Sequence, residues 1–174
     1  MILTTPRLIL RPWTDQDLGV FAAMNADPAV MVDMPALDRG QSAAKLRRYQ
    51  EAYDRHGYCR WALTDHGGGF LGYAGPMPLA EDHPCGPGAE IGWRLTRAAW
   101  GHGYVTEGAA AALKDAFERI GLAEVVSFTA PDNARSQAVM GRLNLTREPD
   151  RDFTAAYPGG DWSGLVWVAR APLP

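Results

Sequence analysis

Apolar residues in the first part of the chain recur at spacings that predict a strand followed by helices. The strand is predicted over residues 7–11, where arginines flank the apolar run L-I-L. Thr14 suits the N-cap of a helix that runs to about Asn25. A short helix that ends before Pro35 and a polar helix over residues 42–55 are predicted next.

The middle of the chain holds three short apolar runs that predict strands. They cover residues 59–64, 70–76 and 89–95. Glycines and other turn residues separate them by short gaps, which favours an antiparallel meander. The longest gap, residues 80–88, is predicted to be a surface loop.

The strongest helical pattern in the chain runs from near Tyr104 to Gly121, with apolar residues three and four positions apart. The elements predicted after it are a strand over residues 124–129, a helix over residues 134–143 capped by Asn133, and weaker strands over residues 145–148 and 165–169. This order predicts an α/β fold whose sheet is antiparallel at first and contains a crossover unit in its second half.

Composition narrows the class of protein without identifying it. The 174 residues are 47% hydrophobic and 21% charged, with a net charge of −3, which fits one domain over residues 1–174. This apolar content argues against disorder. No apolar run approaches the roughly 20 residues of a membrane span, and the N-terminus does not resemble a signal peptide. A slightly acidic chain is a poor candidate for nucleic-acid binding.

Cysteine and histidine usage points to no metal site. Cys59 and Cys85 form no CxxC pair, so neither a zinc site nor a disulfide framework is supported. Two unpaired thiols suit a reducing compartment, and a cytoplasmic location is expected. The histidines have no metal-ligand spacing, so no metal is expected.

The most informative segment, residues 100–107, reads W-G-H-G-Y-V-T-E and joins a predicted strand to the long helix. Gly101 and Gly103 allow a sharp turn and the close approach of a ligand. The helix behind them offers unsatisfied N–H groups and the positive end of its dipole, which together suit phosphates. A tight turn without a ligand is the alternative. The segment is no P-loop, because it lacks lysine, and no dinucleotide fingerprint, because Thr106 replaces the third glycine.

Three longer motifs occur in a fixed order along the chain. They are E-I-G-W-R-L over residues 90–95, W-G-H-G-Y-V-T-E over 100–107 and F-T-A-P-D-N-A-R-S-Q-A-V-M-G-R-L over 128–143. With these motifs the chain resembles the acetyl-CoA-dependent N-acetyltransferase superfamily (GNAT), and most closely its ribosomal-protein-alanine acetyltransferase-like (RimJ/RimL-type) branch. The resemblance implies the GNAT fold: a mixed, mostly antiparallel central sheet, splayed at its middle and flanked by helices.

The resemblance also implies where acetyl-CoA binds. In this family the strand that matches residues 89–95 splays from its neighbour and pairs with the pantetheine arm, which implies contacts from Trp93, Arg94 and Leu95. The turn that wraps the pyrophosphate with main-chain amides is matched by Gly101, His102, Gly103, Tyr104, Val105 and Thr106. Arg97 stands one position before the family's phosphate-binding arginine or glutamine, and either a phosphate contact or plain solvation remains open for it.

Asn133 matches an asparagine that reaches the amide groups of the cofactor, and a plain helix cap is the alternative. Many members of the superfamily place a tyrosine, acting as general acid, where this chain has Met140. Ser136 matches the usual substitute of this branch near the sulfur. A simple role at the start of the helix is the alternative for Ser136.

Acetyl transfer requires a neutral amine, yet a peptide α-amine has a pKa of about 8 and lysine about 10.4. A carboxylate can accept the proton that the amine must lose. Glu90 is the candidate, because it lies on the strand thought to carry the thioester, in the E-I-G-W context that the family uses. Pairing with a neighbouring arginine is its alternative role.

The acceptor site is poorly specified. The resemblance implies that it is lined by the region after the first helix, residues 33–35, and by the loop before the last strand, residues 152–162. Four aromatic residues are either its walls or part of the core: Trp13, Trp61, Tyr157 and Trp162. The expected function is acetyl transfer from acetyl-CoA to a primary amine, either a protein N-terminal amine or a small-molecule amine, by direct attack in a ternary complex. The alternative is a non-catalytic acyl-CoA-binding or regulatory module of the same fold. No nucleic-acid or membrane partner is expected, and a homodimer stays open.

Overall fold

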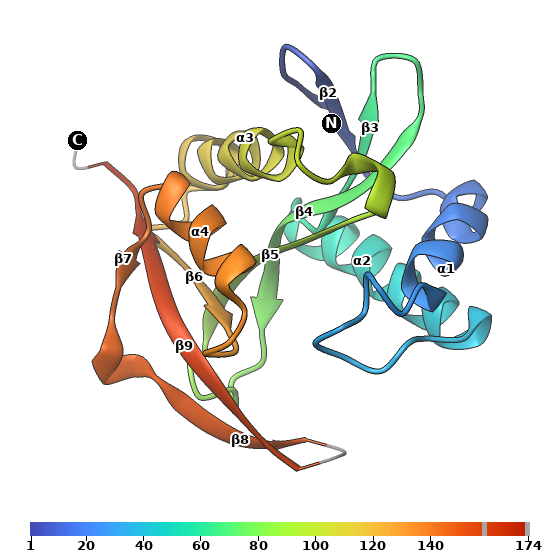
Figure 1. Cartoon of the computed structure of the whole chain (residues 1–174). Coiled ribbons are helices and arrows are strands. Elements are labelled where there is room, and N and C mark those ends of the chain that lie inside the picture. The colour runs from blue at the N-terminus through green and yellow to red at the C-terminus, as the bar shows by residue number, and fades with distance from the viewer. Residues whose placement is uncertain (158–159, 173–174) are drawn as a thin grey trace.

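The computed structural model describes residues 1–157 and 160–172. Within them a mixed sheet carries helices on both faces (Figure 1), with strand order β1-β2-β3-β4-β5-β6-β9-β7 and β8 paired to β9. The strands are β1 (Leu3–Thr4), β2 (Leu8–Arg11), β3 (Trp61–Asp65), β4 (Phe70–Leu79), β5 (Gly88–Leu95), β6 (Glu124–Thr129), β7 (Thr146–Arg147), β8 (Phe153–Tyr157) and β9 (Gly160–Arg170). The helices are α1 (Leu18–Ala26), α2 (Arg39–His56), α3 (Tyr104–Glu118) and α4 (Ala134–Arg142), with short 3₁₀ turns η1 (Asp15–Asp17), η2 (Arg97–Ala99) and η3 (Pro149–Arg151).

The predicted antiparallel meander is confirmed. Strands β2 to β5 pair with their chain neighbours, so that Ala62 lies opposite Tyr73, and Tyr73 lies opposite Arg94. Strand β6 returns parallel to β5, as the crossover through α3 requires, and then pairs antiparallel with β9. The α/β class and the mostly antiparallel sheet agree with the sequence.

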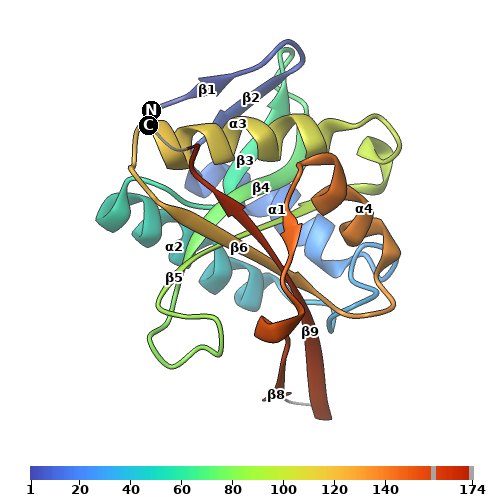
Figure 2. The ribbon, with the colours of Figure 1, turned by 90° about the vertical axis from the view of Figure 1, so that its left-hand side faces the viewer.

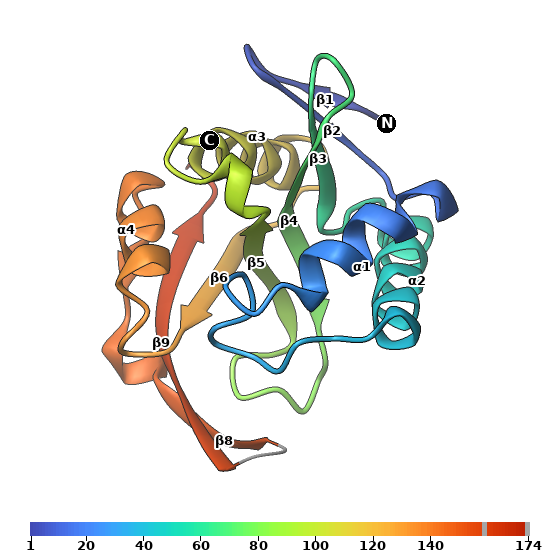
Figure 3. The same cartoon turned by 45° about the vertical axis from the view of Figure 1, so that its right-hand side comes forward.

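The two faces of the sheet carry separate cores, because side chains alternate between faces along each strand. Helices α1 and α2 cover one face (Figure 3), and the core there includes Trp13, Phe21, Tyr49, Ala62 and Tyr73. Helices α3 and α4 cover the other face, and the core there includes Leu63, Ala74, Ile91, Ala109 and Met140. Trp13 and Trp61 are both buried, so the core role is correct for these two aromatic residues.

Local sequence explains where the site-bearing elements begin and end. Gly103, with a φ of 77°, precedes the first residue of α3. Asn133 caps α4, since its Oδ1 accepts from the Ser136 N–H at 3.0 Å. Asn144 follows α4 with a φ of 57°, the left-handed conformation that asparagine tolerates.

The loop between α1 and α2 differs from the sequence prediction. No helix forms between Asp27 and Pro35; the segment consists of turns. Asp27 Oδ1 accepts from the Ala29 N–H at 3.0 Å, a local bond that competes with helix formation. The loop ends where the Leu37 N–H donates to the Asn25 carbonyl at 2.9 Å.

The loop expected over residues 152–162 also differs, because residues 153–157 form β8 and residues 160–162 begin β9. Strand β8 pairs antiparallel with the first half of β9, and these two paired segments extend beyond the rest of the sheet (Figure 2). Phe153 and Trp162 pack against each other and against Phe128 on β6. The side chain of Tyr157 and residues 158–159 lie outside the described part. None of the helices described is long and apolar enough to span a membrane.

Candidate functional site

The candidate site lies where β5 and β6 part. The two strands share one registered pair, Glu90 with Val126, although both continue beyond it. At the parting point the buried Ser127 hydroxyl donates to the Ile91 carbonyl at 2.9 Å. That carbonyl therefore faces β6, and Trp93, two residues further along β5, directs its N–H and C=O toward the same side. The strands form a fork with main-chain groups facing the gap, which confirms the predicted splay.

Glu90 reaches from β5 to an almost fully buried arginine. Arg60 Nη2 lies 2.7 Å from Glu90 Oε1, with the side chains 8% and 20% exposed. Arg60 also donates to the carbonyls of Gly75 and Glu90, so it ties β4 and β5 together. Within the described residues Glu90 Oε2 accepts no hydrogen bond. The carboxylate is therefore held through one oxygen and leaves the other available.

Gly92 makes room for this ion pair. A Cβ atom at position 92 would lie 2.7 Å from Arg60 Nη2 and 3.2 Å from Glu90 Oε1. Glu90 and Gly92 are two residues apart on one strand and therefore share a face of the sheet. The spacing of glutamate and glycine in E-I-G-W thus has a steric cause in this chain, because the guanidinium lies directly over residue 92.

The glycine turn before α3 is exposed and its amides are unpaired. Gly101 and Gly103 have φ values of 78° and 77°, which favour glycine. Within the described part of the chain, the main-chain N–H groups of residues 101–106 donate to no acceptor, and the first such bond of the helix runs from Glu107 to the Gly103 carbonyl. These N–H groups and the helix dipole form a ready anion site.

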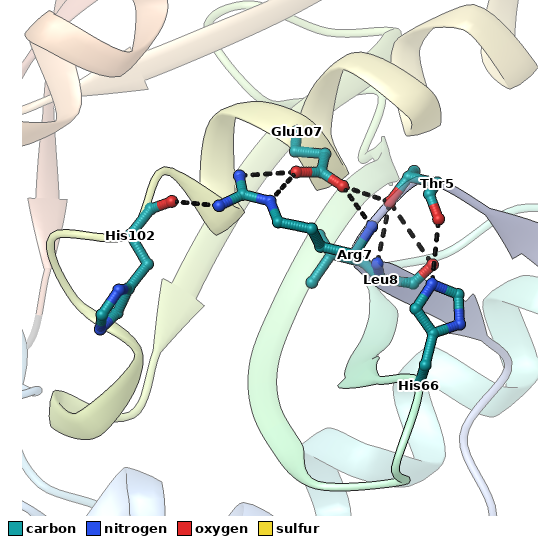
Figure 4. A network of polar contacts seen from close by, with 6 residues as sticks. All are labelled: Thr5, Arg7, Leu8, His66, His102 and Glu107. Carbon is teal, nitrogen blue, oxygen red and sulfur yellow. Dashed lines mark hydrogen bonds and ion pairs between the residues drawn. The ribbon is translucent and has the colours of Figure 1, made fainter.

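A polar network holds the outer side of this turn (Figure 4). Arg7 Nε and Nη2 both lie 2.6 Å from Glu107 Oε2, and Arg7 Nη1 donates to the His102 carbonyl at 2.8 Å. The Thr5 hydroxyl donates to Glu107 Oε1 at 2.6 Å. Burial raises the pKa of Glu107, but hydrogen bonds from Thr5 and Arg7 outweigh burial, so this pKa lies below its ordinary value. The His102 ring is exposed and extends away from Glu107.

Asn133 and Ser136 lie at the start of α4. Besides capping the helix, Asn133 donates from Nδ2 to Asp33 Oδ2 at 2.8 Å, so both ends of its amide are engaged. Ser136 is partly buried in the first turn of the helix, and its hydroxyl has no recorded partner in the described residues. Asn133 thus caps α4, and its bond to Asp33 joins α4 to the α1–α2 loop.

The α1–α2 loop reaches the strands of the fork (Figure 3). The Arg94 guanidinium on β5 donates to the sulfur of Met31 in this loop. Arg97, in η2, forms an ion pair with Asp27, 2.7 Å from Nε to Oδ2. The Arg97 side chain is 63% exposed, and its Nε is paired with Asp27 while its two terminal nitrogens make no bond in the described residues.

A buried tyrosine pair lies on the α1–α2 side of the sheet. Tyr73 and Tyr49 are both buried, with their ring centroids 5.7 Å apart, and burial raises the pKa of Tyr49 well above its ordinary value. Burial also acts to raise the pKa of Tyr73, but nearby cations outweigh it and lower this pKa to about 8; the cations are Lys45, Arg94 and Arg60. A phenol in this range can exchange a proton near neutral pH, as general acid–base catalysis requires.

Neither cysteine has the character of a nucleophile. Cys59 and Cys85 are buried and unpaired. Burial raises the pKa of the Cys59 thiol to about 12 and also raises the pKa of Cys85. Among residues 1–157 and 160–172, no three histidine, cysteine, aspartate or glutamate side chains gather into an arrangement that could hold a metal ion.

Sequence reasoning missed four side chains that shape this site. Arg60, Tyr73, Arg7 and Glu107 all make contacts that depend on strand pairing or on the packing of α3. Glu107 belongs to the W-G-H-G-Y-V-T-E motif, and Arg7 belongs to the opening segment T-P-R-L-I-L-R-P-W-T-D-Q-D-L, which also resembles the first strand and helix of the branch. Arg60 and Tyr73 have no local pattern that separates them from ordinary residues of a predicted strand.

Comparison with known proteins gives one family. The sequence model described as Acetyltransferase (GNAT) domain matches residues 7–146. Among curated proteins, the N-acetyltransferase YoaA of Bacillus subtilis is 26% identical over 153 residues, or 84% of each chain. The FsC-acetyl coenzyme A-N(2)-transacetylase of Aspergillus fumigatus is 39% identical over 83 residues, which are 45% of this chain and 35% of that protein. This match therefore spans about a third of the length of the fungal protein.

Solved structures share the whole fold. The acetyltransferase of Agrobacterium tumefaciens superposes with a TM-score of 0.81 at 25% identity, covering 98% of this chain and 94% of that one. The RimL ribosomal α-N-protein acetyltransferase in complex with coenzyme A superposes with a TM-score of 0.79, covering 98% of both chains. At 17% identity the second likeness concerns the fold alone.

Proposed function

Because this chain belongs to the acetyltransferase (GNAT) domain family, we propose that it transfers an acetyl group from acetyl-CoA to a primary amine by direct attack in a ternary complex. The observation that carries the proposal is the exposed glycine turn, whose N–H groups at residues 101–106 have no acceptor in the described chain. Such a turn at a helix N-terminus suits a diphosphate. The fork between β5 and β6 lies beside it and leaves β5 main-chain groups for an extended amide arm.

In this proposal the donor follows one path along the site. The diphosphate lies on the glycine turn, and the pantetheine arm runs along Trp93, Arg94 and Leu95 on β5. The thioester then lies at the base of the fork, near Glu90 and Ser127. N–H groups of β5 that face the gap stabilise negative charge that develops on the thioester oxygen during attack.

The chain's own groups move the protons. The amine nitrogen attacks the thioester carbonyl, the carbon–sulfur bond breaks, and the amine loses a proton. Glu90 accepts this proton on Oε2, directly or through water, while Arg60 keeps the carboxylate in place through Oε1. Ser136 at the start of α4 donates a hydrogen bond to the departing thiolate. No acyl-enzyme is needed, and the buried thiols agree with this route.

The acceptor is a protein N-terminal amine or a small-molecule amine. It enters from the side of the α1–α2 loop, where Asp33 supplies a carboxylate that attracts a cationic amine. We further propose that the protein works in the cytoplasm as a single catalytic domain over residues 1–174. This part rests on the unpaired cysteines and on the fit of the whole chain to acetyltransferase folds.

Two measurements on the wild-type protein test the proposal. Calorimetry with coenzyme A should give saturable binding, and release of free thiol from acetyl-CoA should depend on an added amine. The amine panel should include peptides with a free N-terminus, the same peptides blocked at the N-terminus but carrying lysine, and small primary amines. Absence of coenzyme A binding would overturn the proposal. Binding without thiol release from any amine would favour a non-catalytic acyl-CoA-binding module.

A further inference from the structure

Arg7, just before β2, forms hydrogen bonds to two residues that flank the glycine turn, His102 and Glu107. Its Nη1 donates to the His102 carbonyl at 2.8 Å, and its Nε donates to Glu107 Oε2 at 2.6 Å. The guanidinium also lies 4.9 Å from the centre of the Tyr104 ring. One side chain therefore contacts the residues on both sides of Gly103 and the first turn of α3, and Figure 4 shows its contacts with His102 and Glu107.

The contact between Arg7 and His102 fixes the direction of a main-chain amide. In a planar trans peptide, the C=O and the following N–H point in opposite directions. Because the His102 carbonyl points to Arg7, the Gly103 N–H points away from Arg7, into the turn whose N–H groups lack acceptors. Glycine has no side chain to hold this peptide, and Gly103 has a φ of 77°, so an outside contact must orient it.

Arg7 itself is held tightly. Its main-chain N–H donates to Glu107 Oε1 at 3.0 Å, and the Thr5 hydroxyl donates to the same oxygen. The His66 ring lies 3.1 Å from the Thr5 carbonyl, which joins the β3–β4 turn to this network. Nε and Nη2 of Arg7 both face the Glu107 carboxylate, which balances the charge of the guanidinium. The guanidinium lies on the side of the turn that faces Glu107.

We propose that Arg7 is a positioning residue for the diphosphate of the acyl donor. It holds the His102–Gly103 peptide so that the Gly103 N–H faces the phosphates, and Glu107 and Thr5 hold Arg7. This inference rests on the proposed function. It adds that donor affinity depends on a side chain that does not touch the donor and that lies almost a hundred positions earlier in the sequence.

Two variants separate geometry from charge. Arg7→Lys keeps the positive charge but loses the planar fork that reaches Glu107 and His102 together. Arg7→Met combined with Glu107→Gln removes both charges at once. Arg48→Lys, an exposed arginine on α2, is the matched control. Each variant is compared with wild type in thermal stability, in calorimetric affinity for coenzyme A, and in kinetics with two donors, acetyl-CoA and S-acetyl-pantetheine, which has no diphosphate.

We expect Arg7→Lys to raise the KM for acetyl-CoA about tenfold, the order expected for one or two lost hydrogen bonds. The kcat should stay within about twofold, and kcat/KM for S-acetyl-pantetheine should not change. The double variant should remain weak for coenzyme A, because charge cancellation does not restore the peptide direction. Arg48→Lys should behave as wild type.

The inference is overturned if kcat/KM for both donors falls by the same factor, since Arg7 would then support the fold alone. It is also overturned if the double variant regains wild-type affinity, since Arg7 would then only cancel the charge of Glu107. An unchanged KM in Arg7→Lys overturns it as well. A wild-type protein that does not bind coenzyme A would instead sink the proposed function, so the two failures are distinguishable.

Discussion

Arg60 and Glu90 form an ion pair in which the arginine is almost completely enclosed, 2.7 Å from Nη2 to Oε1. Arg60 reaches Glu90 across β4 and also binds the carbonyls of Gly75 and Glu90. The pair therefore fixes both the carboxylate and the base of the fork between β5 and β6. Loss of one member of an enclosed pair costs about 3–5 kcal/mol, because the other charge is left without a partner. The catalytic and structural roles of this pair must therefore be tested with variants that keep its shape.

Glu90→Gln keeps the size of the side chain and a hydrogen-bond acceptor for Arg60 while removing the proton acceptor. We expect kcat for acetyl transfer to fall by about 10²–10⁴-fold, as is typical when a general base is lost. Coenzyme A affinity by calorimetry should change by less than about threefold, because Glu90 is not placed on the diphosphate turn. Glu81→Gln in the exposed loop after β4 should leave kcat unchanged.

Tyr73→Phe tests whether Glu90 or the buried phenol of Tyr73 accepts the proton that the amine loses. If Tyr73 carries the amine proton, kcat will fall in Tyr73→Phe and the change in its pH profile will centre near the Tyr73 pKa of about 8. That result, together with an active Glu90→Gln, would contradict the role proposed for Glu90.

Gly92→Ala tests the steric explanation of the E-I-G-W segment. The new Cβ would lie 2.7 Å from Arg60 Nη2, so the guanidinium must move and the ion pair must loosen. We expect a loss of about 1–3 kcal/mol in the free energy of unfolding, the usual cost of overpacking. A fall in kcat larger than the rise in KM for acetyl-CoA should accompany it, since the turn proposed to bind the diphosphate is untouched.

Gly141→Ala is the control for Gly92→Ala, because nothing lies within 4 Å of its added Cβ and its φ is not positive. This change should leave stability unchanged or increase it slightly, since alanine favours helix. Equal effects of the two substitutions on kcat would show that the space over Gly92 has no special role.

The sequence predicts the local elements of this chain better than its long-range contacts. The glycine turn, α3, β6 and α4 follow from periodicity, capping and glycine content, which act within a few residues. Arg60 and Glu90 are 30 positions apart, and their contact depends on the register of three strands. Arg7 and Glu107 are 100 positions apart and meet only after α3 packs beside β2. Such contacts leave no periodic signal.

The two mistaken predictions have the same cause. The local pattern predicts a short helix that ends before Pro35, yet this segment forms turns, and its Asp27 and Met31 contact Arg97 and Arg94. Residues 153–157 lie in a segment that the family resemblance predicts to be a loop, yet they form β8 through their pairing with β9. Tertiary contacts override weak local propensity in both places.

Asp33→Ala tests the bond that engages Asn133. If Asn133 contacts the donor's amide groups, its Nδ2 must first leave Asp33 Oδ2. Removal of this competitor should tighten coenzyme A binding about two- to fivefold, which is the scale of one exposed hydrogen bond. Asp132→Ala removes the same charge from an exposed neighbouring position that makes no side-chain bond to Asn133, and it should not tighten binding.

Asn133→Ser complements this test. Serine retains the ability to cap α4 but has no amide to offer the donor. Coenzyme A binding should weaken while thermal stability changes little. Unchanged affinity in both Asn133→Ser and Asp33→Ala would reduce Asn133 to a helix cap and a loop contact.

The network around Glu107 predicts a pH dependence of stability with a definite sign. Burial raises the pKa of Glu107, but hydrogen bonds from Thr5 and Arg7 hold this pKa below its ordinary value of 4.5. Between the two pKa values the unfolded chain binds the proton more readily than the folded chain, so stability rises with pH there. The contribution is complete above the ordinary value and is lost as the pH falls through the folded-state pKa.

Glu107→Gln removes this proton-linked contribution. The free energy of unfolding of wild type should therefore exceed that of Glu107→Gln at pH 7, and the difference should shrink as the pH drops below 4.5. High salt should also reduce the difference, because the Arg7 side chain is 48% exposed. Glu118→Gln, an exposed glutamate in the same helix, provides the comparison. A gap that stays constant from pH 7 to pH 3 would mean that Glu107 acts through packing rather than through its charge.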